Sequence, residues 1–212
     1  MTGESGTVLL IQFARAPVVG KVKTRMLPHL SAEQACELHC ELAEWTTRQL
    51  LLFEEGELEL AVAGDTSHAL FSRCRALGVT RISQQCGEDL GQRMYHALHG
   101  GLVEFESVIL VGSDCPEIDA AYLRQAVEAL QHADVVLGPA TDGGYVLIGA
   151  RAISATLFEG IPWGSAEVYA NTLAALADTA LSYAELRPLN DIDRPEDLHR
   201  WHALNEAHPI RR

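Results

Sequence analysis

Basic residues are concentrated in one short segment of this otherwise acidic chain. Residues 14–26, ARAPVVGKVKTRM, contain Arg15, Lys21, Lys23 and Arg25, whereas the whole chain has 16 lysines and arginines against 29 acidic residues. Arginine offers a planar fork to phosphate oxygens, and lysine offers a mobile point charge. The cluster therefore indicates a site for a diphosphate group, with a solvated surface loop as the alternative.

An aspartate follows a run of apolar residues in the segment 107–118, SVILVGSDCPEI. The run 108–111 reads as a buried strand, and Asp114 comes just beyond its carboxyl end. Open α/β sheets bind ligands outside the carboxyl ends of their strands, so an acid there can hold a metal ion or a ribose hydroxyl. The alternative is that Ser113 or Asp114 only caps a turn before Pro116.

A glycine-containing segment, QCGEDLGQRM at 85–94, leads into a predicted helix. Free N–H groups at a helix start can bind phosphate, which makes Gly91 and Arg93 candidates for nucleotide binding. Arg93 could instead pair with Glu88 or Asp89 on the surface.

The segment 138–149, GPATDGGYVLIG, places Asp142 before two glycines and an aromatic residue. A hairpin turn alone explains Asp-Gly-Gly. In the functional interpretation Asp142 orients or deprotonates an acceptor hydroxyl, and Gly143, Gly144 and Tyr145 line the acceptor pocket.

Two more segments, IPWGSAEV at 161–168 and LNDIDRPEDL at 189–198, complete the set. Trp163 is either a wall of the acceptor pocket or a packing residue. Asp191 and Asp193 precede a predicted helix, where acids are favoured with or without a metal. Helix capping explains one of the two acids and leaves the other as a candidate ligand.

Short β-type runs alternate with longer helical patterns along the chain, which predicts a three-layer α/β fold with a mostly parallel sheet. Antiparallel pairing is expected between 133–140 and 145–150, on either side of the Asp-Gly-Gly turn. The other strands are expected at 7–13, 58–64, 79–83, 107–112 and 182–187, and the helices at 31–53, 66–77, 89–101, 119–131, 165–179 and from 194.

Composition restricts the class of protein. The 48% of hydrophobic residues can form one core, so residues 1–212 are expected to form a single domain. A formal net charge of −13 argues against nucleic acid as a partner. No apolar run is long enough for a membrane span, and the five cysteines form no C-x-x-C pair. A cytoplasmic protein with reduced cysteines and no membrane partner is expected.

The order of the six segments resembles the bacterial transferases called radical-SAM/selenodomain-associated transferase 1, or arsenosugar-biosynthesis-type glycosyltransferases. The resemblance covers about residues 7–203. It implies a Rossmann-like, GT-A-like fold of the nucleotide-diphospho-sugar transferase superfamily, which also includes guanylyltransferases and CMP-sugar synthetases.

The resemblance also implies roles for individual residues. The G-S-D-C-P segment is similar to the superfamily's G-x-D-x-P strand exit, whose aspartate holds a divalent cation, and Asp114 matches it. The D-R-P-E-D-L segment resembles that of CMP-sugar synthetases and makes Asp193 the second carboxylate for Mg²⁺ or Mn²⁺. K-T-R resembles a guanylyltransferase loop and matches Lys23 and Arg25 to phosphate contacts.

A metal-dependent transferase is therefore expected, with a nucleotide or nucleotide-sugar and a small acceptor as its ligands. Lys23 and a cation at Asp114 would stabilise the phosphate leaving group. The chain lacks the glycine-rich G-x-G-x-R-M loop of many nucleotidyltransferases, which favours glycosyl transfer over nucleotidyl transfer from a triphosphate. A nucleotide-binding protein without catalysis is the third reading.

Overall fold

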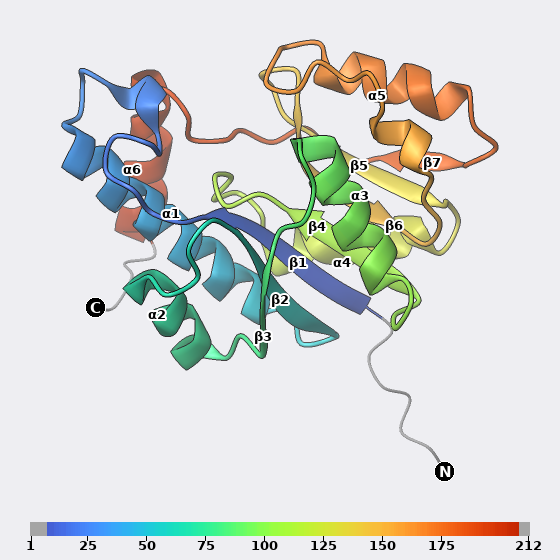
Figure 1. Ribbon diagram of the computed structural model, residues 1–212, viewed down its shortest axis with the longest axis horizontal. Helices are drawn as coiled ribbons and strands as arrows, with labels where there is room; N and C mark the ends of the chain where they lie inside the picture. Colours follow the sequence, from blue (N-terminus) through green and yellow to red (C-terminus); the bar gives the residue numbers. More distant parts are fainter. Residues whose placement is uncertain (1–7, 208–212) are drawn as a thin grey trace.

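A seven-stranded sheet forms the centre of the protein, in a computed structural model that describes residues 8–207 (Figure 1). The strand order is β3-β2-β1-β4-β6-β5-β7. The strands are β1 (Val8–Arg15), β2 (Gly56–Ala63), β3 (Arg81–Gln84), β4 (Ser107–Val111), β5 (Val135–Pro139), β6 (Tyr145–Ala150) and β7 (Tyr183–Glu185).

The pairing of the strands agrees with the expected mixed sheet. β1 is parallel to both β2 and β4, and β2 is parallel to β3. β6 is antiparallel to both β4 and β5, and β5 is parallel to β7. The hairpin around Asp142 thus inserts its second strand between β4 and β5, and the α/β fold class is confirmed.

Helices cover both faces of the sheet. They are α1 (Ala32–Leu51), α2 (Ala69–Leu77), α3 (Leu90–Gly101), α4 (Ala120–Leu130), α5 (Val168–Ala177) and α6 (Leu198–Ala207), with short 3-10 turns η1 (Thr24–Met26), η2 (Ala155–Phe158) and η3 (Pro195–Asp197). Alternate residues of β1 point to opposite faces of the sheet and pack in the two helical layers. Leu10 packs with α1, α2 and α4, whereas Leu9 packs with α3 and α5.

A third apolar cluster joins α6 to α1 at one end of the molecule (Figure 1). The rings of Trp45 and Trp201 meet edge to face with centroids 5.5 Å apart. Met26 and Ile192 are fully buried in the same cluster. The cluster therefore holds the basic segment and the segment before α6 against one helix.

The helix starts follow local capping chemistry. Ser31 and Gln34 form the expected capping box on α1, and the Asp119 carboxylate accepts the N–H of Tyr122 at 2.7 Å. α5 begins at Val168, later than the expected 165, because Ser165 accepts the N–H of Glu167 in a turn before the helix.

The state of the cysteines and the hydropathy of the helices can be compared with the sequence. All five cysteines are free, and Cys36, Cys74 and Cys115 are buried. Among residues 8–207, none of the helices is both long enough and apolar enough to cross a membrane.

Candidate functional site

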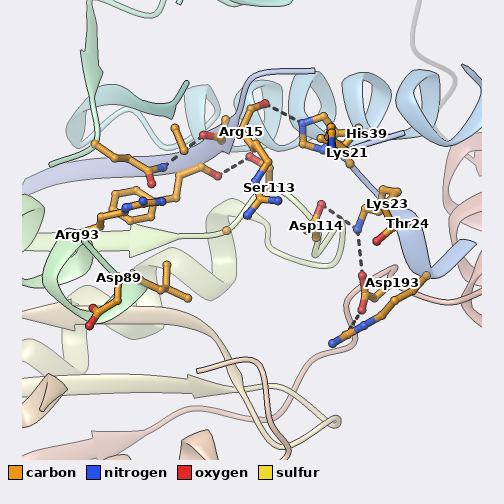
Figure 2. A pocket seen from close by; sticks show the side chains of 18 of the residues that line it. Arg15, Lys21, Lys23, Thr24, His39, Asp89, Arg93, Ser113, Asp114 and Asp193 are labelled. Carbon is orange, nitrogen blue, oxygen red and sulfur yellow. Dashed lines mark hydrogen bonds and ion pairs between the residues drawn. The ribbon is translucent and has the colours of Figure 1, made fainter. Parts of the chain in front are cut away.

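A cavity of about 670 Å³ opens at the carboxyl ends of β1 and β4, where an α/β sheet is expected to bind its ligand (Figure 2). We call it the first cavity. The residues around it come from β1, the basic segment, α1, the loop from β3 to α3, the start of α3, the exit of β4 and the segment before α6. They include Phe13, Arg15, Lys21, Lys23, Thr24, Arg25, His39, Gln85, Glu88, Asp89, Arg93, Ser113, Asp114 and Asp193.

Lys23 lies at the base of this cavity and is already paired. Its Nζ is 2.9 Å from Asp114 Oδ1 and 3.9 Å from Asp193 Oδ1, and it donates a hydrogen bond to the carbonyl of Ile192. Only 2% of the side chain is exposed. The lysine therefore brings together the two carboxylates that the resemblance assigned to a metal.

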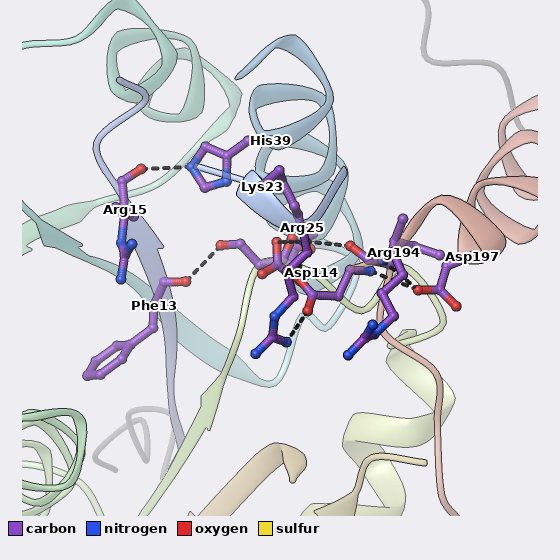
Figure 3. Close-up of polar contacts among 12 residues, drawn as sticks. Phe13, Arg15, Lys23, Arg25, His39, Asp114, Arg194 and Asp197 are labelled. Carbon is purple, nitrogen blue, oxygen red and sulfur yellow. Dashed lines mark hydrogen bonds and ion pairs between the residues drawn. The ribbon is translucent and has the colours of Figure 1, made fainter. Parts of the chain in front are cut away.

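Arg25 occupies the other side of Asp193. Its guanidinium donates to Asp193 Oδ2, and this contact raises the pKa of Arg25 (Figure 3). Half of the arginine side chain remains exposed. In this structure, Lys23 and Arg25 thus neutralise Asp114 and Asp193, and their phosphate contacts stay predictions.

Three other cations face the first cavity without an acidic partner. Neither the Arg15 guanidinium nor the Lys21 ammonium forms an ion pair or hydrogen bond with another residue of the range 8–207, and both side chains are exposed. Arg93 Nε donates to the carbonyl of Gly87 at 3.0 Å. The alternative, in which Arg93 pairs with Glu88 or Asp89, is therefore wrong. These cations are available to an anionic ligand.

A buried hydrogen-bond network holds the loop that carries Asp114. Ser113 Oγ donates to the carbonyl of Phe13 at 2.8 Å and accepts from Gln12 Nε2 at 3.0 Å. Thr47 Oγ1 in turn donates to Gln12 Oε1 at 2.7 Å. Ser113 therefore ties the exit of β4 to β1, a more specific role than capping a turn.

His39 is a cavity residue that no sequence motif indicated. The ring nitrogen Nε2 lies 2.9 Å from the carbonyl oxygen of Arg15, and burial lowers the pKa of the imidazole, which keeps it neutral at pH 7. A signal did exist, because His39, Ala43 and Thr47 recur at helical spacing on the buried face of α1.

A second cavity of about 440 Å³ adjoins the first and shares Arg25, Leu90 and Asp193 with it. Tyr145 and Trp163 meet nearly at right angles in its wall, with ring centroids 6.4 Å apart. The cavity is also lined by Met94, Thr141, Asp142, Gly144, Asp191, Arg194, Asp197 and Arg200.

Two of the predicted glycines lie behind the cavity walls. A Cβ atom on Gly91 would be 2.7 Å from the Trp163 ring, so this glycine lets α3 pack against the tryptophan. Gly143 has φ +95, and its carbonyl accepts the N–H of Tyr169 at 2.8 Å. Neither residue lines either cavity, whereas Gly144 lines the second.

The second cavity contains two carboxylates without a cationic partner among the described residues. Asp142 accepts the N–H of Gly144 at 3.0 Å, as the turn interpretation predicts. Burial, followed by the charges of Asp142 and Asp193, raises the pKa of Asp191 to about 6. The capping carboxylate is that of Asp197, which accepts the N–H groups of Asp193 and Arg194. The prediction that Asp191 or Asp193 caps the helix is therefore wrong.

The carboxylates fit a divalent cation only in part. Within residues 8–207, no group of three or more His, Cys, Asp or Glu side chains is arranged to hold a metal. Asp114 and Asp193 supply hard oxygen ligands and keep 45% and 25% of their side chains exposed. Asp114 Oδ1 is buried and accepts no hydrogen bond of normal geometry, although Lys23 Nζ faces it. Such a cation would take its remaining ligands from phosphate and water.

Solved structures share this architecture. A proposed nucleotide-diphospho-sugar transferase from Desulfovibrio desulfuricans G20 is 30% identical, with a TM-score of 0.83 over 98% of this chain and 91% of its own. A 4-diphosphocytidyl-2C-methyl-D-erythritol synthase from Anaerococcus prevotii DSM 20548 is 10% identical, with a TM-score of 0.63 over 94% of this chain and 98% of its own. A cytidylyltransferase from Leptospira borgpetersenii is 13% identical, with a TM-score of 0.60 over 97% and 89%. The last two likenesses establish the fold alone.

The comparison with curated proteins gave no match. The family model described as "Uncharacterized protein conserved in bacteria (DUF2064)" matches residues 46–165, more than half of the chain. This segment runs from the middle of α1 through β4 and Asp114 to the loop that carries Trp163. The chain belongs to the DUF2064 family and has the fold of the nucleotide-diphospho-sugar transferases and cytidylyltransferases.

Proposed function

We propose that this protein is a metal-dependent transferase that takes a nucleotide-sugar as donor and passes the sugar to a small acceptor. One observation carries the proposal. Two cavities meet at Arg25 and Asp193, and one is lined by unpaired cations while the other has an aromatic wall and carboxylates. This arrangement suits a donor diphosphate in the first cavity and an acceptor in the second.

In the proposed reaction, Arg15, Lys21 and Arg93 bind the donor phosphates. Breaking the bond between the sugar and the diphosphate leaves negative charge on the diphosphate. Positive groups already in place stabilise that charge without reorganising. Lys23 and Arg25 join them once phosphate oxygens compete with Asp114 and Asp193.

We propose Mg²⁺ or Mn²⁺ as the cofactor, held by Asp114 and Asp193. When bound, the ion acts as a Lewis acid on the phosphate oxygens. The support is the pair of partly exposed carboxylates that Lys23 holds together.

The acceptor is proposed to bind against Gly144, Tyr145 and Trp163. An aromatic wall packs on the apolar face of a small polar molecule, and carboxylates accept hydrogen bonds from its hydroxyls. Asp142 orients or deprotonates the reacting hydroxyl, and Asp191 lies in the same cavity as a second acceptor of hydrogen bonds.

Nucleotidyl transfer from a nucleoside triphosphate is the second candidate. The Lys-Thr-Arg sequence at 23–25 and the fold likeness to cytidylyltransferases favour it. The absence of the G-x-G-x-R-M loop favours the nucleotide-sugar. The six shared segments also support the narrower assignment, by resemblance, to the radical-SAM/selenodomain-associated transferases.

The test offers labelled nucleotide-sugars and labelled nucleoside triphosphates separately, with Mg²⁺ or Mn²⁺ and a pool of small polar acceptors. We expect release of nucleoside diphosphate from a sugar donor. Release of pyrophosphate from a triphosphate, with the sugar donors intact, would establish the second candidate instead. Nucleotide binding without turnover would indicate a nucleotide-binding protein without catalytic activity.

Asp114→Asn should abolish the cation-dependent part of this activity, because one of the two proposed ligands loses its charge. Asp178→Asn is the matched control, since Asp178 is exposed at the end of α5 and lines neither cavity. Equal loss in the two variants would count against a role of Asp114 in the reaction.

A further inference from the structure

The ammonium of Lys23 has the surroundings of a bound cation. Three oxygens face it, from Asp114, from the Ile192 carbonyl and, at 3.9 Å, from Asp193. Figure 2 shows Lys23 with Asp114 and Asp193 beside it. With 2% of its side chain exposed, Lys23 is removed from solvent. A buried charge is stable only when such partners replace the water that it has lost.

The backbone at Lys23 has an unusual conformation that places this side chain among the three oxygens. Lys23 has φ 49, and within residues 8–207 it is the only residue other than glycine with a positive φ. Such a conformation is unfavourable for an ordinary residue and persists only where its surroundings enforce it. The carbonyl of Asp114 accepts the N–H of Ile192 at 2.8 Å, which fixes the other two partners relative to each other.

The residue type is also unusual for this chain. The sequence contains two lysines, Lys21 and Lys23, and uses arginine at all other strongly basic positions. A lysine ammonium is a compact point charge, whereas a guanidinium is a broad planar fork. Only the compact group takes the place of a single metal ion among three oxygens.

Charge balance then opposes a divalent cation in the free protein. The two carboxylates, Asp114 and Asp193, are matched by the two bases, Lys23 and Arg25. A divalent ion at these carboxylates would place two positive charges beside a buried ammonium whose ion pairs are with the same two carboxylates. The charge of Asp191 also acts on Lys23, but Asp191 forms no ion pair with it among the described residues. Like charges at such short range repel strongly outside bulk water.

A diphosphate reverses this balance. In a nucleotide-sugar each of the two phosphates carries one negative charge, so the ligand and a divalent ion enter together without changing the net charge. The phosphate oxygens also give the Lys23 ammonium a new partner. Asp114 and Asp193 are then free to bind the metal.

We propose that Lys23 occupies the metal position in the free protein, and that a divalent cation binds only together with a diphosphate group that takes over the ammonium. This inference rests on the proposed nucleotide donor. Its main test uses Mn²⁺ alone, so that its failure is distinguishable from failure of the proposed function.

The experiment measures Mn²⁺ binding by electron paramagnetic resonance and by water-proton relaxation, without nucleotide. Lys23→Gln removes the charge and keeps a donor for the Ile192 carbonyl. It should bind Mn²⁺ at least ~10-fold more tightly than the parent, because a close like charge has gone. Arg75→Gln is the matched control and should leave Mn²⁺ affinity at the parent level, since Arg75 is an exposed base on α2 that lines neither cavity.

The double variant Lys23→Gln with Asp114→Asn should lose the gained affinity, which identifies the ligand. Circular dichroism establishes that each variant is folded, and Lys23→Met replaces Lys23→Gln if the latter does not fold. The parent should show enhanced relaxation only when Mn²⁺ and a nucleoside diphosphate are both present. Tight Mn²⁺ binding by the free parent, or no gain in Lys23→Gln, would overturn the proposal. A parent that binds no nucleoside diphosphate would instead refute the proposed function.

Discussion

Ser113→Ala provides a sharp test of how the Asp114 loop is held. The serine hydroxyl makes two buried hydrogen bonds, donating to the Phe13 carbonyl at 2.8 Å and accepting from Gln12 Nε2 at 3.0 Å. Ser113 is 5% exposed and Gln12 is fully buried, so the Gln12 amide has little access to water that could replace the lost partner. The substitution removes both bonds and leaves an amide hydrogen of Gln12 without an acceptor.

The cost of the substitution follows from these contacts. Each hydrogen bond contributes about 1 kcal/mol net, and a buried group left unsatisfied adds a further penalty, which together give about 2–3 kcal/mol of lost unfolding free energy. For a chain of this length, 1 kcal/mol lowers the melting temperature by about 2–4 °C, so a decrease of roughly 4–12 °C is expected. Gln12 retains its bond to the Ala43 carbonyl, which keeps the loss at this level.

The assay is thermal unfolding followed by circular dichroism, combined with Mg²⁺-dependent nucleotide binding by calorimetry. Ser72→Ala is the matched control, because Ser72 is exposed on α2 and should change stability by less than about 0.5 kcal/mol. Nucleotide affinity should fall in Ser113→Ala, because Asp114 loses its support on β1. A melting temperature equal to that of Ser72→Ala would refute the hydrogen-bond argument.

Three further predictions concern other residues around the two cavities. Gly91→Ala places a methyl group 2.7 Å from the Trp163 ring. It should lower the unfolding free energy by about 1–3 kcal/mol and change the tryptophan fluorescence, whereas an unchanged stability and fluorescence would contradict the close packing. Burial lowers the pKa of His39 from its ordinary value of 6.5, so the stability that the neutral imidazole contributes is fully present above pH 6.5 and is lost as pH falls from there through the lower folded-state pKa. His39→Gln should therefore lower the melting temperature more at pH 8 than at pH 5, and an equal decrease at the two pH values would contradict a lowered pKa. Replacing both Arg15 and Lys21 by Gln should weaken a nucleoside diphosphate more than the free nucleoside in calorimetry, because each contact to a charged group contributes about 1.5–3 kcal/mol; equal weakening of both ligands would exclude phosphate contacts.

The sheet could be predicted from the sequence because buried strands and capped helices have local signals. All five residues of β4 are buried, four of them apolar, and Ser31 with Gln34 marks the start of α1. Strand direction also followed from chain order, since the Asp-Gly-Gly turn allowed only an antiparallel β5–β6 pair. The position of Asp114 beside the first cavity followed from its place at a strand end, which needs no knowledge of side-chain contacts, and its role stays a prediction.

The pairing within the site was beyond such reasoning. Nothing local to residues 14–26 shows that Lys23 turns inward while Lys21 remains exposed, because that depends on a positive φ and on oxygens from distant segments. The position of Asp191 in the second cavity was equally unpredictable. A single bridge between Ala140 and Leu189 brings its segment alongside the end of β5, and a one-residue bridge leaves no pattern in the sequence.

The site is assembled by hydrophobic packing at some distance from the charges. Ile192 is fully buried beside Met26 and Trp201, while its N–H and carbonyl bind Asp114 and Lys23. The docking of α6 on α1 therefore sets the distance between the two carboxylates. A charged site that must release an ammonium and admit a metal needs such a rigid frame, because an ion pair alone does not hold three chain segments in register. The terminal helix, which lines only the edge of the second cavity through Arg200, thus contributes to the first cavity by holding Ile192 and Asp193 in place.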